Sequence, residues 1–149
     1  MKIEFFSFDS LSNHLLYDLI ALRERVFVVE QNCPYLDCDG SDKESIHLLI
    51  SSNQSLTAYA RLVPPHESQQ FWSIGRVVVA PEFRGKDIGK LLMQHAIDEL
   101  INNMGAEIIV ISAQTYLMKF YNNLGFHEVG EGYLEDDIPH VKMIYKIEN

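Results

Sequence analysis

The chain has few cysteines, few basic residues and no long apolar segment, and each shortage excludes a class of protein. Its two cysteines, Cys33 and Cys38, have no second pair nearby, so neither a disulfide framework nor a zinc knuckle is predicted. No apolar run approaches the roughly 18 residues of a membrane span. Glu4 interrupts the apolar stretch near the N-terminus, which is unlike a secretory signal. We therefore expect free thiols in a soluble, cytoplasmic protein.

The scarcity of basic residues bears on the partners of the chain. Its 12 lysines and arginines stand against 21 acidic residues, a net charge of −9. Nucleic acid and anionic membranes are therefore disfavoured as main partners. Three of the cations, Arg84, Lys86 and Lys90, nevertheless lie in one short segment. This pattern favours an anionic cofactor and, more weakly, a cationic substrate, with a solvated helix start as the alternative reading of the cluster.

Length and composition predict a single domain over residues 1–149, of which 47% are hydrophobic. Residue spacing predicts helices at 15–26, 88–104 and 115–123, and a loop at 32–43. It predicts strands at 3–8, 46–51, 56–63, 72–79, 108–112, 125–131 and 141–147. The strand, helix and strand over 72–112 form a parallel, right-handed crossover. The other strands are expected to be antiparallel, so we predict an α/β (α+β) fold with a mixed sheet.

The segment between the strand 72–79 and the helix 88–104 has the features of an anion site. Val77, Val78 and Val79 favour an extended chain, and Pro81 ends the strand. The turn that follows consists of Arg84, Gly85, Lys86, Asp87, Ile88, Gly89 and Lys90. At a helix N-terminus the unpaired N–H groups and the helix dipole attract anions, and glycines let the anion approach the main chain. The turn therefore predicts a diphosphate site.

A second pattern, Phe120-Tyr121 followed by Gly125-Phe126, lies downstream of a buried strand. Together with the anion turn it makes the chain resemble the GNAT superfamily of acyl-CoA-dependent N-acetyltransferases. The amino-acid sequence of several segments is similar to that of the ElaA-like branch of the superfamily. These segments are residues 26–35, 58–61, 75–79 and 137–140. The resemblance implies a mixed, mostly antiparallel sheet of about six to seven strands flanked by helices, with a βαβ acyl-CoA-binding core.

The resemblance also implies where acetyl-CoA binds. The pyrophosphate would lie on the backbone N–H groups of the turn from Gly85 to Lys90, and the pantetheine arm would pair with the strand Val77 to Val79. A backbone N–H of that strand would stabilise the oxyanion, and Gln114 stands where many members have an asparagine that contacts pantetheine. The family pattern has a glycine at position 87, where this chain has Asp87. A carboxylate beside a pyrophosphate is unfavourable, so we expect Asp87 to face solvent.

Tyr121 matches the family position that protonates the leaving thiolate. A phenol with a pKa of about 10 can give its proton to a thiolate within hydrogen-bond reach. The alternative is that the Tyr121 hydroxyl binds the sulfur or a loop carbonyl without acting as an acid.

The amine needs a base, and the strand position that supplies a glutamate in some branches is Ile109 here. The candidates are Glu30, His47 and His140. Glu30 follows an apolar run at a helix end, where burial would raise its pKa towards neutrality, so it ranks first. His47 begins a predicted strand, where a histidine is more often a hydrogen-bonded part of the sheet than a base. The remaining histidines have no metal-like spacing, so no metal site is implied.

The acidic residues Glu131, Glu135, Asp136 and Asp137 are predicted to form a solvated loop, or to border the acceptor site. Arg61 and Arg76 lie on predicted strands, where each could pair with a carboxylate or one could orient the segment near Glu30. The resemblance implies transfer of an acetyl group from acetyl-CoA to a primary amine, on a small molecule or a peptide. The alternative is a non-catalytic acyl-CoA-binding or sensing protein. The sequence leaves the choice between monomer and homodimer open.

Overall fold

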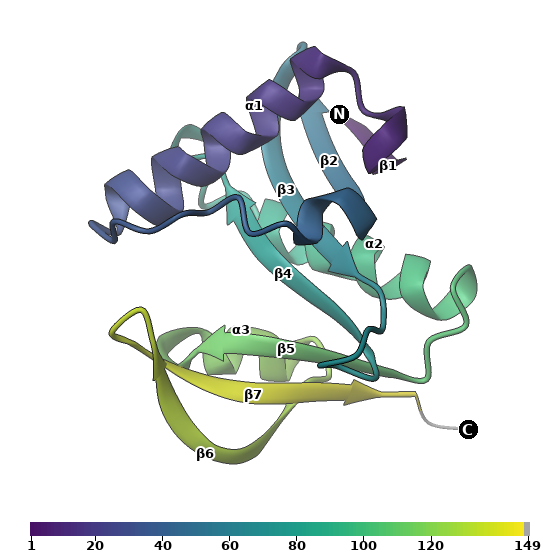
Figure 1. Cartoon of the computed structure of the whole chain (residues 1–149), viewed down its shortest axis with the longest axis vertical. Coiled ribbons are helices and arrows are strands. Elements are labelled where there is room, and N and C mark those ends of the chain that lie inside the picture. The colour runs from purple at the N-terminus through teal and green to yellow at the C-terminus, as the bar shows by residue number, and fades with distance from the viewer. Residues whose placement is uncertain (148–149) are drawn as a thin grey trace.

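The fold is built on one mixed sheet. In the computed structural model, which describes residues 1–147, seven strands are ordered β1-β2-β3-β4-β5-β7-β6 (Figure 1). The strands are β1 (Lys2–Ser7), β2 (Ile46–Ser52), β3 (Ser55–Val63), β4 (Trp72–Val79), β5 (Ile108–Gln114), β6 (His127–Glu135) and β7 (Ile138–Lys146). Only β4 and β5 are parallel, joined by the predicted crossover. The mixed, mostly antiparallel sheet of the sequence prediction is confirmed.

The helices begin and end at residues that suit those positions. They are α1 (Asn13–Arg23), α2 (Ile88–Asn102) and α3 (Met118–Asn123), with a π-helix, η2 (Glu24–Glu30), continuing α1. Short 3-10 turns are η1 (Phe8–Ser10), η3 (Ser41–Glu44), η4 (Pro81–Phe83) and η5 (Thr115–Leu117). Ser12 caps α1, because its Oγ accepts a hydrogen bond from the Leu15 N–H at 3.1 Å. Within residues 1–147, none of these helices has the length and apolar character needed to cross a bilayer.

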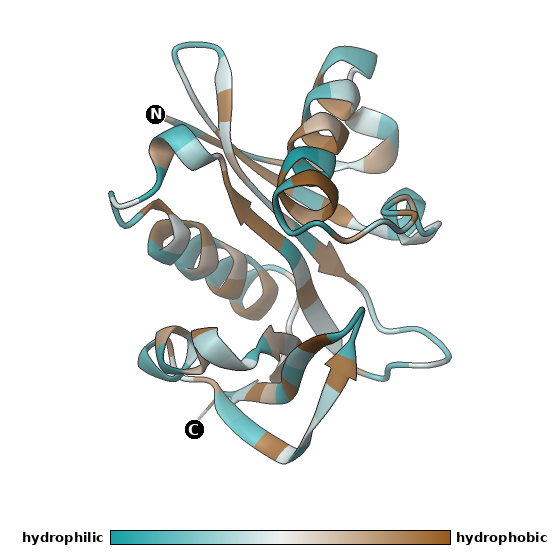
Figure 2. Ribbon diagram, turned by 90° about the vertical axis from the view of Figure 1, so that its left-hand side faces the viewer, coloured by the Kyte–Doolittle hydropathy of each residue, from teal (hydrophilic) through white to brown (hydrophobic). Residues whose placement is uncertain are grey.

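Two hydrophobic cores lie on opposite faces of the sheet (Figure 2). On one face α2 buries Leu92, Met93 and Leu100 against β2, β3 and β5. On the other face α1 and η2 bury Leu19, Leu22 and Val26 against inward residues of β2 to β4. α2 therefore presents an apolar stripe to the sheet and a polar face to solvent, whereas the outer face of α1 and η2 also exposes Tyr17 and Val29.

The pairing of β4 with β5 is short. It consists of Trp72 opposite Ile109 and Ser73 opposite Val110, and beyond these two pairs the strands diverge (Figure 1). The sheet therefore has two parts, β1 to β4 and β5 to β7, separated by an opening at the carboxyl ends of β4 and β5.

The last hairpin differs from the sequence prediction. Residues 131–137 were expected to form a solvated loop, but β6 extends to Glu135 and β7 begins at Ile138. The connecting residues Asp136 and Asp137 both have positive φ, 51° and 63°, which matches a two-residue type I′ turn. Aspartate tolerates this conformation, so the pair that suggested a loop makes a tight hairpin instead.

A cluster of buried ion pairs holds the segment 32–44 against the sheet. We call it the Arg–Asp cluster, and it consists of Arg23, Asp37, Asp39, Asp42, Arg61 and Arg76. Arg23, on α1, is fully buried and donates to Asp37 Oδ2 at 2.5 Å and to Asp42 Oδ1 at 2.7 Å. Arg61, on β3, donates to the same Asp42 oxygen at 3.0 Å. Asp42 thus joins α1, β3 and η3.

The cluster depends on ionisation. Burial would raise the pKa of Asp42, but the hydrogen bond and charge of Arg23, together with Arg61, lower it below its usual value. Asp39 shows the same balance, with its pKa lowered by Arg61 against burial. Because these pKa values are lower in the folded chain, the cluster stabilises the fold above about pH 4, and this stabilisation is lost as the pH falls through the folded values.

We predict that Asp42→Asn lowers the free energy of unfolding at pH 7 by about 3 kcal/mol, because two buried arginines lose a counter-charge. Urea unfolding at pH 7 and at pH 3 measures this, and the difference from the wild type should shrink at pH 3, where Asp42 itself becomes protonated. Asp98→Asn, at an exposed position of α2, is the control. Equal stability of the two variants at pH 7 would contradict a stabilising role of Asp42.

Candidate active site

The opening between β4 and β5 holds a cavity of about 460 Å³. Its walls come from Gly75, Arg76 and Val77 of β4, from Val110 to Ser112 of β5, and from the β6–β7 hairpin. The segment that follows η2 closes a further side with Cys33 and Tyr35. The cavity therefore lies where the sheet divides, and residues distant in the sequence meet there.

β4 carries a bulge at the wall of this cavity. The register with β3 passes from Tyr59 opposite Val78 to Arg61 opposite Gly75, so β4 has one residue more than its partner strand. Arg76 in the bulge has a φ of 49°, which is unusual for a residue with a long side chain. A bulge leaves the backbone groups of the extra residue without a ladder partner, so backbone donors become accessible beside the cavity.

The Arg–Asp cluster holds this bulge in place. Arg76 Nη1 donates to Asp37 Oδ1 at 2.9 Å and also to the Tyr35 hydroxyl. Its guanidinium lies 4.5 Å from the centre of the Phe27 ring. Both strand arginines, Arg61 and Arg76, thus pair with carboxylates of the segment 32–44. The pairing that the sequence left open is therefore made with this loop and not with Glu30.

Tyr121 reaches the cavity from α3. Its ring packs edge-on against Phe120 and Phe126, with ring centres 5.1 Å and 6.0 Å away. The side chain is buried, and burial raises the pKa of Tyr121 to about 12. Among the described residues its hydroxyl has no hydrogen-bond partner, while Tyr121 lines the cavity. The phenol is therefore neutral at pH 7 and keeps a donor for a ligand.

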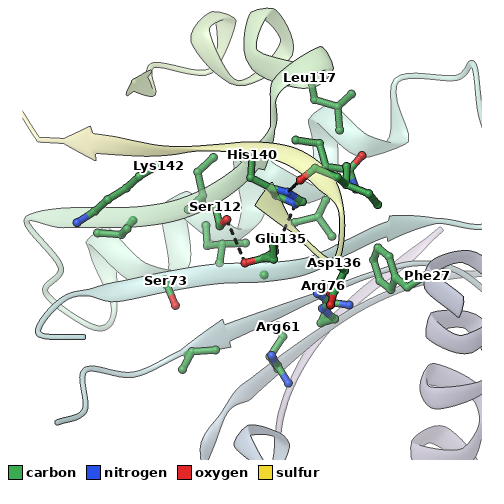
Figure 3. A pocket seen from close by; sticks show the side chains of 18 of the residues that line it. Phe27, Arg61, Ser73, Arg76, Ser112, Leu117, Glu135, Asp136, His140 and Lys142 are labelled. Atoms are coloured by element: carbon green, nitrogen blue, oxygen red, sulfur yellow. Dashed lines mark hydrogen bonds and ion pairs between the residues drawn. The ribbon is translucent and has the colours of Figure 1, made fainter. Parts of the chain in front are cut away.

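His140 faces the cavity from β7, opposite Gln114 of β5. Its Nδ1 lies 2.7 Å from the Ile138 carbonyl oxygen, and its Nε2 lies 3.3 Å from Glu135 Oε2 (Figure 3). The ring stacks on Tyr133, whose hydroxyl hydrogen-bonds Ser112 Oγ. These contacts fix both the position and the rotation of the imidazole.

The anion turn lies at the start of α2, after the C-terminal end of β4. Gly85 has a φ of 80° and Asp87 a φ of 59°. A Cβ added at Gly89 would lie 3.7 Å from Val79 and 3.7 Å from the Phe120 ring, so the helix start packs against β4 and α3. The turn and Tyr121 are therefore brought to the same side of the sheet.

Asp87 faces solvent, as expected from the sequence. Position 87 needs a positive φ, which explains the glycine of the family pattern, and aspartate is among the few other residues that tolerate it. Its side chain makes no capping hydrogen bond to α2. Within residues 1–147 it also has no ion pair with Lys86 or Lys90. The carboxylate thus remains near the turn without a counter-charge.

Glu30 does not have the environment that was expected. The prediction of a buried side chain is wrong, because 43% of the Glu30 side chain is exposed. Its carboxylate pairs with Arg84 of the anion turn, with distances of 3.1 Å and 2.8 Å to the two terminal nitrogens. The reason is that the π-helix η2 ends beside the turn and directs Glu30 to the surface, while Val26 of the same helix is buried.

His47, the third candidate base, is part of the protein interior. It is fully buried and bonds the Tyr59 hydroxyl through Nδ1 at 2.6 Å and the Asp42 carbonyl through Nε2 at 2.8 Å. Burial lowers the pKa of His47, so the neutral ring is favoured. Its two ring nitrogens are both occupied, which leaves none for a substrate.

The structure therefore brings some of the predicted residues together and separates others. Val77, Gln114, Tyr121 and His140 line one cavity. Val78 points to the opposite face and packs in the core beneath η2. Sequence reasoning passed over Ser112 and Tyr133, and it treated Glu135 only as one member of an acidic run; all three line the cavity. The two-residue spacing of Tyr133 and Glu135 on one strand face was the available signal, but the acidic run concealed it.

Both cysteines are free, as predicted. Among residues 1–147 no group of three or more histidine, cysteine, aspartate or glutamate side chains is placed to hold a metal ion.

Comparison with known proteins defines the class. Residues 28–147 match the family described as "Acetyltransferase (GNAT) domain". The chain therefore belongs to the GNAT acetyltransferase family, and the seven-stranded sheet agrees with the fold of solved members.

Individual relatives are similar over nearly the whole chain. Protein ElaA of Escherichia coli strain K12 is 40% identical over 141 residues, covering 93% of this chain and 92% of ElaA. The crystal structure of E. coli ElaA has a TM-score of 0.91 at 37% identity, covering 98% of this chain and 100% of that one. The similarity to the ElaA-like branch is thus confirmed.

Two further structures extend the comparison. An acyl-CoA N-acyltransferase from Pseudomonas aeruginosa has a TM-score of 0.87 at 38% identity, covering 97% of this chain and 99% of that one. An aminoglycoside 6′-N-acetyltransferase complexed with coenzyme A has a TM-score of 0.76 at 18% identity, covering 100% and 98%. The aminoglycoside 6′-N-acetyltransferase thus has the same fold as this chain.

Proposed function

We propose that the chain is an N-acetyltransferase that moves an acetyl group from acetyl-CoA to a primary amine by direct transfer in a ternary complex. The observation that best supports this proposal is that a bulged strand, a buried tyrosine and a cationic helix start lie together where β4 and β5 diverge. Membership of the GNAT family supports this reading. We propose the cytoplasm as the place of action.

The residues at the opening fit acetyl-CoA. The first N–H groups of α2 have no intrahelical partner, and Gly85 and Gly89 leave the main chain accessible to a pyrophosphate. Lys86 and Lys90 add positive charge there. The edge of β4 beyond its two pairs with β5 has backbone groups available for a pantetheine arm. Gln114 lines the same cavity and would contact that arm.

The bulge and Tyr121 would stabilise the two charges that develop on the thioester. An unpaired N–H of the strand at Val77 can donate to the oxyanion without reorganisation. Tyr121 can donate to the sulfur as the carbon–sulfur bond breaks. Complete transfer from a phenol with a pKa of about 12 to a thiolate with a pKa of about 8.5 is uphill by roughly 4 to 5 kcal/mol. Tyr121 is therefore better suited to a hydrogen bond to the departing thiolate than to free acid catalysis.

The acceptor would enter from the side of the β6–β7 hairpin. The charges of Arg61 and Arg76 are balanced there by Asp37, Asp39 and Asp42. Asp136 of the hairpin turn lines the cavity and has no ion pair within residues 1–147, so it favours a cationic amine, on a small molecule or a peptide, as acceptor. Of Glu30, His47 and His140, His140 is the one that lines the cavity.

The first test measures thiol release from acetyl-CoA over a panel of small primary amines and peptides. We expect turnover with at least one alkylamine that depends on both substrates. A rival function is motivated by Asp87 and by the isoleucine at position 109: a GNAT-fold protein that binds acyl-CoA without turnover. Binding of CoA by calorimetry, with no turnover on any amine, would support the rival and contradict the enzyme.

Replacing Tyr121 by phenylalanine should lower kcat about 100-fold, because one preorganised donor to the developing charge is lost. The KM for acetyl-CoA should change less than about twofold, since the ring packing is kept. Tyr116→Phe is the matched control, because Tyr116 lies nearby on η5 and is exposed. If Tyr121→Phe retains the wild-type kcat, the role of Tyr121 is refuted.

Replacing Asp87 by asparagine should tighten CoA binding about two- to fivefold, because a negative charge is removed from a helix N-terminus that binds an anion. Asparagine tolerates the same positive φ, so the turn should be preserved. Calorimetry at low salt and at 1 M salt measures the change, which should shrink at high salt. Asp98→Asn again serves as the control. An unchanged Kd would show that the carboxylate has no influence on the pyrophosphate.

A further inference from the structure

The carboxylate of Glu135 has an ordered position in the cavity that the binding of CoA does not explain. Glu135 is the last residue of β6, and 45% of its side chain is exposed. One oxygen lies 3.3 Å from His140 Nε2, and the other accepts from Ser112 Oγ at 3.5 Å (Figure 3). Three strands, β5, β6 and β7, therefore contribute to holding one carboxylate at the cavity wall.

The tautomer of His140 follows from its neighbours. Nδ1 faces a carbonyl oxygen, which can only accept, so this nitrogen carries a proton. The second nitrogen, Nε2, is the one that faces the Glu135 carboxylate, at 3.3 Å from Oε2. Since the ring is buried and stacked on Tyr133, it cannot turn to present Nε2 to a substrate. Glu135 is the exposed member of the pair and His140 the buried one.

The arginines of the cavity wall do not neutralise the charge of Glu135, because both are paired with other carboxylates. The groups that face the cavity are Tyr133, Asp136, His140 and Lys142 of the hairpin, and Arg61 and Arg76 of the opposite wall. Arg61 and Arg76 are paired within the Arg–Asp cluster. Asp136 lies in the hairpin turn, and its side chain has no hydrogen-bond partner among residues 1–147, so it is not held in one position as Glu135 is.

We propose that Glu135 is the group that takes the proton from the acceptor ammonium, with His140 as its positioning residue. This inference rests on the proposed acetyl transfer. The ammonium gives one proton to the Glu135 carboxylate, which returns it to solvent through the exposed side. The neutral nitrogen forms its bond to the thioester carbon, and the electron pair of the carbon–sulfur bond goes to sulfur. The second proton lost by the nitrogen ends on that sulfur, so atoms and charge balance.

The other positions considered for the base are not suited to take this proton. Glu30 is bound to Arg84 at the anion turn and does not line the cavity. His47 has both nitrogens bonded within the protein. The strand position used in some branches of the family is Ile109, which is fully buried in the core. Glu135 lies on β6, not on the strand β5 that carries Ile109, and it lines the same cavity as Tyr121 of α3.

The experiment compares Glu135→Gln with the wild type on two amines of similar size. One is the best alkylamine of the panel, and the other is its fluorinated analogue, which is largely neutral at the assay pH. We expect kcat/KM to fall about 100-fold or more for the basic amine and less than about fivefold for the weakly basic one, since only the first needs deprotonation. Raising the pH should restore the variant on the basic amine as the neutral amine fraction rises.

Controls separate this role from a structural one. Glu128→Gln makes the same change at an exposed position of β6 that does not line the cavity, and its kcat/KM should stay within about threefold. The Kd for CoA should be unchanged in Glu135→Gln, which shows that the cavity is intact. For His140, glutamine keeps an N–H donor and should retain more kcat than leucine, with the KM for acetyl-CoA constant in both.

The outcomes are distinguishable. If the wild type has no turnover, the proposed function fails and the inference fails with it. If the wild type is active and Glu135→Gln loses the same factor on both amines, or retains activity on the basic amine, the acetyl transfer stands and the assignment of Glu135 is overturned.

Discussion

The site depends on the early divergence of β4 from β5. Two residue pairs join the parallel strands, and beyond them the backbone edges face an opening instead of each other. A sheet that parts in this way needs its two halves held by other means. The core formed by α2 supplies this, because its apolar stripe packs against strands of both halves. The opening is thereby kept at a fixed width, and the cavity can have stable walls.

The ion pairs of the Arg–Asp cluster hold the wall of the cavity on the side of β4. Replacing a buried ion pair by apolar residues often costs little stability, so the value of the Arg–Asp cluster lies in the position it imposes. Asp42 holds arginines from α1 and β3, and Asp37 holds arginines from α1 and β4. The segment 32–44, which has little secondary structure of its own, becomes a rigid wall because these carboxylates cannot leave their partners without exposing buried charge.

The wall on the side of β7 is braced by hydrogen bonds. The type I′ turn at Asp136 and Asp137 returns the chain so that Glu135 and His140 lie close together. Tyr121 and Glu135 differ in burial, and this difference suits them to different roles. Tyr121 is buried and keeps its proton, which suits a donor to the leaving sulfur. Glu135 has one side open to the cavity, which suits a group that must exchange protons with solvent.

The sequence by itself determined the order and approximate bounds of the strands and helices, apart from the extent of β6, and the position of the anion turn, since hydrophobic period and glycine placement act through local backbone preferences. It also pointed to Asp87, because Asp87 replaces a glycine of the family pattern, and the structure adds that this position has a positive φ. Only the tertiary structure decided which acidic residues line the cavity. Glu30 was expected to be buried, yet its burial depends on how η2 ends beside Arg84. Glu135 was hidden in an acidic run, and only the pairing of β6 with β7, and of β7 with β5, brings it to His140 and Ser112. Such contacts join residues far apart in the chain, so no local pattern encodes them.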